Sequence, residues 1–291
     1  MPMITSVLDN PKAERIRRAA ELSNARSRRR SGRLLIEGPQ AVREAVKWTP
    51  TALSDLYVQV AESHDDGSWT VPDGPLPQIV DAASSQPGLY VHGVTEAVMN
   101  KLSSNAQGIA AVGEIDALSP AYDDALLDVR PCIAAFWQVR DPGNAGAVIR
   151  AADAAGCDAV MFVDDCVDRF NPKVVRSTAG SLFHIPVFTM STQEMFSWCA
   201  RREITVVAAD IYGTAAHRPE QLPTVLSEHR MPASRLLLFG NEARGLPQSL
   251  LEQVDRIVTI PIYGKAESLN LATSAAVMLF ALAMSSHIAR M

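Results

Sequence analysis

The chain has 291 residues, of which 47% are hydrophobic and 20% are charged, and its formal net charge is −5 at pH 7. These values are typical of a soluble globular protein that is long enough for two domains. Because the longest apolar run, residues 275–284, is far shorter than a bilayer span of roughly 20 residues, and because no leader pattern opens the chain, we expect a cytoplasmic protein with no membrane segment.

Positive charge is concentrated at the start of the chain. Residues 1–47 carry 11 Lys and Arg against 5 Asp and Glu, residues 48–128 carry 1 against 12, and residues 129–291 carry 15 against 15. Most of the early cations are arginines, whose planar guanidinium donates paired hydrogen bonds to phosphate. A solvated helix face is the alternative, but the arginine bias favours nucleic-acid binding. The candidate contacts are Arg17, Arg18, Arg28, Arg29 and Arg30.

The first 117 residues are predicted to form a small α/β domain. Apolar periodicity and turn residues delimit its elements. Helices are expected at residues 13–30, 39–48 and 95–102, and strands at residues 34–36, 55–60, 89–92 and 109–112. A Gly, Pro and Ser-rich loop covers residues 63–77, and the aspartate-rich stretch 118–128 is predicted to be a linker.

Regular alternation of strands and helices begins after residue 129. Strands are predicted at residues 132–138, 159–163, 185–188, 205–210, 236–240 and 256–260, and helices at residues 145–155, 174–181, 191–201, 247–253 and 269–288. The strands are almost continuously apolar, which indicates a parallel sheet covered on both faces. Ligands of such sheets bind beyond the carboxyl ends of strands, so we expect a site in the loops after Gln138, Gly240 and Ile260.

The first of these loops resembles a dinucleotide-binding turn. Gly143-Asn144-Ala145-Gly146 follows a strand and begins a helix, but the earlier glycine of the complete fingerprint is missing. A nicotinamide-dependent enzyme is therefore the weaker alternative. On the same helix, which is rich in Ala, Val and Ile, Arg150 is unusual enough to require a partner, and we expect it near Asn144.

The other two loops carry polar groups at the ends of strands. Phe239-Gly240-Asn241-Glu242 places a carboxylate after a strand, where it could also serve as a loop anchor. Glu267-Ser268-Leu269-Asn270 precedes the last helix, where serine and asparagine could simply be caps. Each motif alone is weak, and only their combination indicates a function.

In order and spacing, these motifs resemble the SpoU/TrmH family of the SPOUT superfamily, which methylates ribose 2′-oxygens in RNA. The resemblance rests on Asn144-x-Gly146-x-x-x-Arg150, on the segment from Asn171 to Val187, on Phe239-Gly240-Asn241-Glu242, on Ile260-Pro261 and on Ser268-Leu269-Asn270. The early segment around Arg28 to Gly38 is similar to the L30e-like substrate domain of that family. The resemblance therefore extends over nearly the full chain.

The resemblance implies S-adenosylmethionine as the methyl donor, RNA as the substrate, a homodimer and no metal. It implies an L30e-like domain over residues 1–117, the linker 118–128, and a parallel α/β domain with a trefoil knot over residues 129–291. The implied catalytic residues are Asn144, Arg150, Glu242, Ser268 and Asn270. The implied donor contacts are Phe239, Gly240, Asn241, Ile260, Pro261 and Leu269. By position, Arg176 joins the candidate RNA contacts.

If the resemblance to this family holds, we expect the methyl transfer to depend most on Arg150. A guanidinium stays protonated, so we expect Arg150 to clamp the target phosphate and stabilise charge on the attacking oxygen rather than to act as a base. Glu242 is expected to orient Arg150 or Arg244, and Asn144 to orient the hydroxyl. The family resemblance favours 23S ribosomal RNA as substrate, with transfer RNA, or a non-catalytic RNA-binding protein of the same fold, as alternatives.

Overall fold

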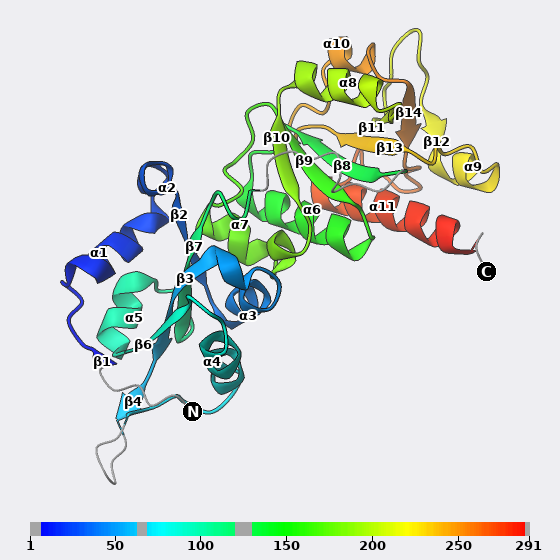
Figure 1. The fold of residues 1–291 in the computed structure, drawn as a ribbon. Helices are drawn as coiled ribbons and strands as arrows, with labels where there is room; N and C mark the ends of the chain where they lie inside the picture. Colours follow the sequence, from blue (N-terminus) through cyan, green and yellow to red (C-terminus); the bar gives the residue numbers. More distant parts are fainter. Residues whose placement is uncertain (1–6, 63–68, 120–129, 289–291) are drawn as a thin grey trace. The chain divides into compact units, whose positions relative to one another are not determined.

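The computed structural model describes residues 7–62, 69–119 and 130–288, which fall into two compact units (Figure 1). The N-terminal unit comprises Met1–Pro120 with Asp168–His184, and the C-terminal unit comprises Ala121–Val167 with Ile185–Met291. Residues 168–184, predicted to belong to the domain 129–291, therefore pack within the N-terminal unit instead. Most of the predicted linker 118–128 lies outside the described residues.

The N-terminal unit is built on a five-stranded mixed sheet of order β1-β6-β3-β7-β2. The strands are β1 (Val7–Leu8), β2 (Arg33–Glu37), β3 (Leu53–Gln59), β6 (Tyr90–Val94) and β7 (Ile109–Glu114), with a separate ribbon of β4 (Ala61–Glu62) and β5 (Trp69–Thr70). The helices are α1 (Glu14–Ala20), α2 (Ala25–Ser31), α3 (Pro39–Trp48), α4 (Leu76–Ser84), α5 (Glu96–Leu102) and α7 (Pro172–Ser177). Helices α1 and α5 share one buried cluster with the sheet, whereas α3 packs against α4.

The single helix predicted over residues 13–30 is interrupted. After α1, the 3-10 turn Glu21–Ser23 leads to Asn24, which is extended and whose side chain accepts the backbone N–H of Arg26. An asparagine cap of this kind competes with a continuous helix, and the sequence prediction missed it. The predicted end near Gly32 is confirmed, because Gly32 adopts a left-handed conformation with φ of 68°.

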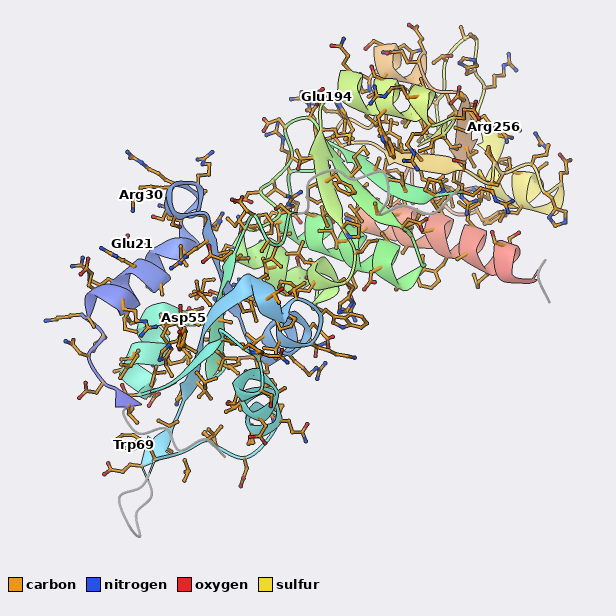
Figure 2. The ribbon with its side chains drawn as sticks, viewed as in Figure 1. Glu21, Arg30, Asp55, Trp69, Glu194 and Arg256 are labelled. Atoms are coloured by element: carbon orange, nitrogen blue, oxygen red, sulfur yellow. The ribbon has the colours of Figure 1, made fainter. Side chains whose placement is uncertain are left out.

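Asp55 on β3, labelled in Figure 2, gives the N-terminal unit a pH-dependent contribution to stability. Burial alone would raise the pKa of its carboxyl, but hydrogen bonds from His92, Ser54 and Arg15 lower that pKa to about 2. A pKa lowered on folding stabilises the protein above the unfolded pKa and loses this effect as the pH falls toward the folded pKa.

We therefore expect Asp55→Asn to lower the free energy of unfolding at pH 7 by about 2 kcal/mol. In urea titrations the difference from wild type should shrink as the pH is lowered from 5 toward 2. Asp73→Asn, which changes an exposed aspartate of the same unit, should have almost no effect. A difference that stays constant with pH would contradict this account.

The C-terminal unit is a parallel α/β structure, as predicted. Its seven strands have the order β10-β9-β8-β13-β11-β14-β12, and every neighbouring pair is parallel. The strands are β8 (Cys132–Trp137), β9 (Ala159–Val163), β10 (Val187–Met190), β11 (Thr205–Ala209), β12 (Glu220–Gln221), β13 (Arg235–Phe239) and β14 (Arg256–Thr259). The helices are α6 (Pro142–Ala154), α8 (Thr192–Arg201), α9 (Leu222–Ser227), α10 (Gln248–Leu251) and α11 (Leu271–Ile288). The short elements β12 and α9 were not predicted.

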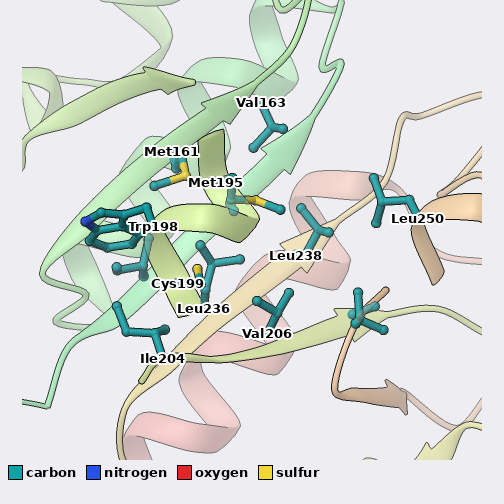
Figure 3. Packing of buried hydrophobic residues seen from close by; sticks show 14 of the residues in the cluster. Met161, Val163, Met195, Trp198, Cys199, Ile204, Val206, Leu236, Leu238 and Leu250 are labelled. Carbon is teal, nitrogen blue, oxygen red and sulfur yellow. The ribbon is translucent and has the colours of Figure 1, made fainter. Parts of the chain in front are cut away.

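Two helical layers cover this sheet, with α6 and α11 on one face and α8 and α10 on the other (Figure 1). Alternate residues of β13 serve the two faces: Leu236 and Leu238 pack in a cluster with Trp198 of α8 (Figure 3). On the opposite face, the rings of Phe136 and Phe239 stack at 5.2 Å between centroids. Burial on both faces explains why these strands read as continuous apolar runs.

Within the described ranges, no helix is long and apolar enough to cross a bilayer. The same ranges contain no cluster of three or more His, Cys, Asp or Glu side chains placed to hold a metal ion.

Candidate active site beyond three parallel strands

A cavity of about 420 Å³ lies beyond the carboxyl ends of β11, β13 and β14, within the C-terminal unit. Its wall includes five of the six predicted donor contacts, namely Phe239, Gly240, Asn241, Ile260 and Leu269, and two predicted catalytic residues, Glu242 and Ser268. Pro261 is not part of the wall, although its neighbours Ile260 and Ile262 are. The second and third sequence motifs thus meet around one cavity.

The loop after β11 also forms part of the wall, and the sequence reasoning did not name it. It contributes Asp210, Ile211, Tyr212 and Gly213, and the carboxylate of Asp210 accepts the backbone N–H groups of Tyr212 and Gly213. The signal was present, because an apolar strand ends at this point and is followed by a polar turn. Because β11 lies between β13 and β14 in the parallel sheet, its carboxyl end opens at the same edge as theirs.

The turn after β13 is tightly closed. Asn241 and Gly245 exchange two backbone hydrogen bonds, and the Asn241 side chain accepts the N–H of Ala243. A Cβ atom at Gly240 would lie 2.4 Å from the carbonyl carbon of Gly245, which no side chain tolerates. Glycine at position 240 is therefore a steric requirement of this wall, because the backbone folds back on itself there.

Glu242 joins this turn to the loop that begins α6. Its carboxylate accepts the backbone N–H groups of Arg140, at 3.3 and 3.4 Å, and of Asp141, at 3.2 Å. It also accepts the side-chain amide of Asn144 at 3.3 Å. In parallel, the Asn241 amide donates to the carbonyl of Gln138 at 2.7 Å. The first and second motifs are therefore fixed to each other by side chains of the second.

Asn270 connects the third motif to the same network. Its amide nitrogen donates to the side-chain oxygen of Asn144 at 3.1 Å, while its own side-chain oxygen accepts the N–H groups of Ala272 and Thr273 at the start of α11. Asn270 thus caps α11 and also bonds to Asn144, so a capping role is compatible with its predicted role in the site. Asn144, Glu242 and Asn270 form one hydrogen-bonded chain across all three motifs.

Arg150 does not join this network. It is exposed on α6 and does not line the cavity, and its side chain makes no hydrogen bond or ion pair within the parts of the chain that the structure describes. Six residues of helix correspond to about 600° of rotation, which turns the two side chains toward different faces of α6, and the predicted proximity of Arg150 to Asn144 stays a prediction. In the described ranges Glu242 bonds the loop before α6 and the side-chain amides of Asn144 and Asn241, so the expected orientation of Arg150 or Arg244 by Glu242 stays a prediction.

The charges on the cavity wall favour binding of a positively charged ligand. Three carboxylates, those of Asp210, Glu242 and Glu267, line it together with one guanidinium, that of Arg244. Opposite charges attract across such a partly enclosed space more strongly than in water. The wall is therefore suited to a ligand that carries positive charge.

The predicted RNA-contacting arginines, all in the N-terminal unit, have different environments. Arg28 is only 2% exposed, and its guanidinium donates to the carbonyls of Leu22 and Ser23 and to Asp168. It is therefore a structural ion, and its prediction as an RNA contact is corrected. Burial of a charge requires such partners.

The side chains of the other five predicted arginines are partly or fully exposed to solvent. Arg176 pairs with the buried Glu37, Arg18 pairs with Glu14, and Arg30 lies 3.8 Å from Glu21 (Figure 2). Arg17 and Arg29 are exposed, and no ion pair involves them in the described ranges. These five side chains stay candidates for RNA contact.

Comparison with known proteins agrees with the site geometry. The profile of the SpoU rRNA Methylase family matches residues 131–280, and the profile of the MRM3-like substrate binding domain matches residues 13–111. The chain is 30% identical over 277 residues to the 23S rRNA (guanosine(2553)-2′-O)-methyltransferase RlmP of Bacillus subtilis, which covers 94% of this chain and 97% of the relative.

Solved structures show the same relationship. The AdoMet-bound rRNA methyltransferase from Sinorhizobium meliloti has a TM-score of 0.74 and 26% identity, over 95% of this chain and 96% of that one. The SpoU methyltransferase AviRb from Streptomyces viridochromogenes has a TM-score of 0.74 and 25% identity, over 94% and 98%. Because a family profile matches more than half of the residues and a relative is matched almost end to end, this chain belongs to the SpoU rRNA methylase family.

Proposed function

We propose that this protein transfers a methyl group from S-adenosylmethionine to a ribose 2′-oxygen of ribosomal RNA, with 23S ribosomal RNA as the substrate. The observation that carries the proposal is the hydrogen-bonded chain of Asn144, Glu242 and Asn270, of which Glu242 lines a cavity with a mainly acidic wall. Family membership supports the same reaction and argues against the dinucleotide-dependent alternative. Relatives named as 23S rRNA 2′-O-methyltransferases support the choice of substrate.

The residues of the cavity suit the proposed donor. S-adenosylmethionine carries a sulfonium cation and, when bound, supplies an electrophilic methyl group. Asp210 and Glu267 would favour the positive charge, and the closed turn at Gly240 and Asn241 would offer backbone groups to a small ligand. Ser268 and Leu269 form the adjoining wall.

The proposed work of the protein is positioning and charge stabilisation. In-line attack by a ribose oxygen requires alignment within a few tenths of an ångström, and rigid loops supply it. The Glu242 carboxylate fixes the loop that carries Asn144, whose side chain then orients the hydroxyl. Arg150 would clamp a phosphate of the RNA and stabilise negative charge on the attacking oxygen. Arg150 does not line the cavity of its own chain. The clamp therefore requires either that the bound RNA extends to α6 or that a second copy of the chain places its α6 at the cavity.

We propose a homodimer on the basis of the outer face of α11. Val277, Phe280 and Met284 are exposed by 41%, 39% and 57%, and they are spaced as one apolar helical stripe. An exposed stripe of this kind favours association. A solution mass of twice the chain's 31.4 kDa would support the dimer.

Further features of the proposal follow from family membership. The C-terminal unit is proposed to contain a trefoil knot, and the N-terminal unit to be an L30e-like domain that binds the RNA, as the match to a substrate binding domain supports. Since the proposed substrate is ribosomal RNA, we propose a cytoplasmic location.

Transfer of radiolabelled methyl groups to unmodified RNA transcripts tests the proposed function directly. The purified protein should label 23S ribosomal RNA at a ribose 2′-oxygen, and not a transfer RNA pool. Calorimetry should detect binding of S-adenosylmethionine but not of a nicotinamide dinucleotide. Labelling of transfer RNA alone would overturn the substrate, and RNA binding without donor binding would identify a non-catalytic protein.

Gly240→Ala should weaken donor binding by about tenfold or more, because the added methyl group must displace the backbone of Gly245. Calorimetric titration with S-adenosylmethionine measures the effect. Gly264→Ala is the matched control, since no atom lies within 4 Å of a Cβ built there. Equal loss of affinity in both variants would show that steric closure at position 240 is not the cause.

A further inference from the structure

Trp48, the last residue of α3 in the N-terminal unit, exposes 55% of its surface in a fixed orientation. Its indole N–H donates to a carboxylate oxygen of Glu44, one helical turn earlier, at 3.3 Å. A single exposed apolar residue is ordinary, but an exposed indole whose polar edge is already bound presents a pre-oriented aromatic face.

Basic side chains surround this ring. The Lys47 ammonium lies 5.0 Å from the ring centroid, and the imidazole of His184 lies 5.3 Å away, tilted by 56°. Arg43 pairs with Glu44 and donates to Gln40. The surface around Trp48 therefore combines an aromatic plane with two permanent cations and an imidazole, and we name Arg43, Lys47, Trp48 and His184 the tryptophan platform.

Glu44 bonds to three of the four platform side chains. Its side chain is 13% exposed and contacts Arg43, His184 and the Trp48 indole. Burial alone would raise the pKa of the Glu44 carboxyl, but hydrogen bonds from Arg43 and His184 lower it below its usual value. The Glu44 carboxylate is therefore largely buried and bonded to the platform side chains, whereas the Arg43 side chain is 51% exposed.

Two distant segments build the platform. His184 ends residues 168–184, and its side chain meets Glu44 across 140 positions of sequence. In the same segment, Gly180 packs so closely that a Cβ atom would lie 2.4 Å from the Glu44 side chain. The segment is also tied to α3 by a hydrogen bond from Gln40 to the carbonyl of Ala179. Such fitted contacts limit the freedom of the indole.

We propose that the tryptophan platform stacks one unpaired base of the substrate RNA, with Arg43 and Lys47 contacting the adjoining phosphates. Aromatic side chains flanked by cations bind single-stranded RNA in this way, because every base has a stacking face. The cations Arg43 and Lys47 beside the indole attract the phosphates that flank a stacked base. The platform lies on α3, on the sheet face opposite α1, so it is distinct from the arginines predicted on α1 and α2. This inference rests on the proposed RNA substrate and adds a binding site to it.

The test compares Trp48→Ala and Trp48→Phe with Trp69→Ala, which removes another exposed tryptophan of the same unit (Figure 2). The probes are a mixed-sequence single-stranded RNA of 12 nucleotides and a 23S ribosomal RNA transcript, titrated at several salt concentrations. We expect Trp48→Ala to weaken binding about tenfold without changing the salt slope, Trp48→Phe to retain most of the affinity, and Trp69→Ala to match wild type. Lys47→Ala should instead reduce the salt slope by about 0.7.

Melting temperatures and S-adenosylmethionine affinity are recorded for every variant. Wild-type RNA affinity in a folded Trp48→Ala variant overturns the platform and makes Trp48 a protein contact or a plain surface residue. Loss of RNA affinity in Trp48→Phe as large as in Trp48→Ala also overturns stacking. If wild type uses Trp48 to bind RNA but transfers no methyl group, the proposed catalysis fails while the platform stands.

Discussion

Replacing Glu242 with alanine should reduce methyl transfer by about a hundredfold, since misplacement of a positioning loop by about 1 Å costs this much. The carboxylate accepts two backbone N–H groups and the side-chain amides of Asn144 and Asn241, so its removal takes this acceptor from four donors. Glutamine should restore only part of the activity: its oxygen can accept from Asp141 and Asn144, but its NH₂ group would then face the N–H of Arg140 and the side-chain amide of Asn241. Single-turnover rates with saturating donor measure the effect.

Glu252→Ala provides the control for this prediction, because Glu252 is an exposed glutamate of the same unit, just after α10. Its turnover should equal that of wild type. Calorimetry on Glu242→Ala separates positioning from folding: a normal melting temperature with a reduced rate supports positioning. A rate within a factor of about two of wild type would contradict the role assigned to the carboxylate.

Arg150→Ala should lower the rate of methyl transfer by about a hundredfold to a thousandfold, and Arg150→Lys should recover only a small part. A point charge replaces some of the electrostatic stabilisation but lacks the paired hydrogen bonds to phosphate. Stability should change by less than about 0.5 kcal/mol, because Arg150 is exposed and its side chain makes no hydrogen bond or ion pair in the described ranges. Wild-type turnover of Arg150→Lys would contradict the clamp.

Arg201→Ala, which removes an exposed arginine in the last turn of α8, is the matched control. A mixing experiment then locates the action of Arg150. If Arg150 serves a second copy, mixed dimers of Arg150→Ala and Glu242→Ala chains should recover activity, since one of the two sites is then intact. If it serves its own chain, mixing should recover none.

The sequence predicted the C-terminal unit well because its signals are local. Six strands between Cys132 and Thr259 are apolar runs with both faces covered, and such runs are visible without coordinates. The convergence of Asn144, Glu242 and Asn270 followed from the rule that the carboxyl ends of parallel strands share one edge. The same rule, applied too narrowly, missed Asp210.

Long-range burial and exact side-chain direction could not be read from the sequence. Arg28 belongs to an arginine-rich stretch and resembles its neighbours, yet it alone of that run is enclosed, by a carboxylate 140 residues away. Nothing local distinguishes it. The direction of the Arg150 side chain was predictable in part, because the helical period turns it about 240° away from that of Asn144.

The inclusion of residues 168–184 in the N-terminal unit determines how this protein can be divided. A fragment ending near residue 120 would lack Asp168 and Arg176. The buried guanidinium of Arg28 would then lose its partner Asp168, and the buried carboxylate of Glu37 would lose its partner Arg176. Chimeras that exchange substrate specificity between relatives must therefore graft two separate stretches of polypeptide together. Evolution of a new RNA target is subject to the same constraint, because a substitution in one stretch alters the packing and ion pairs of the other.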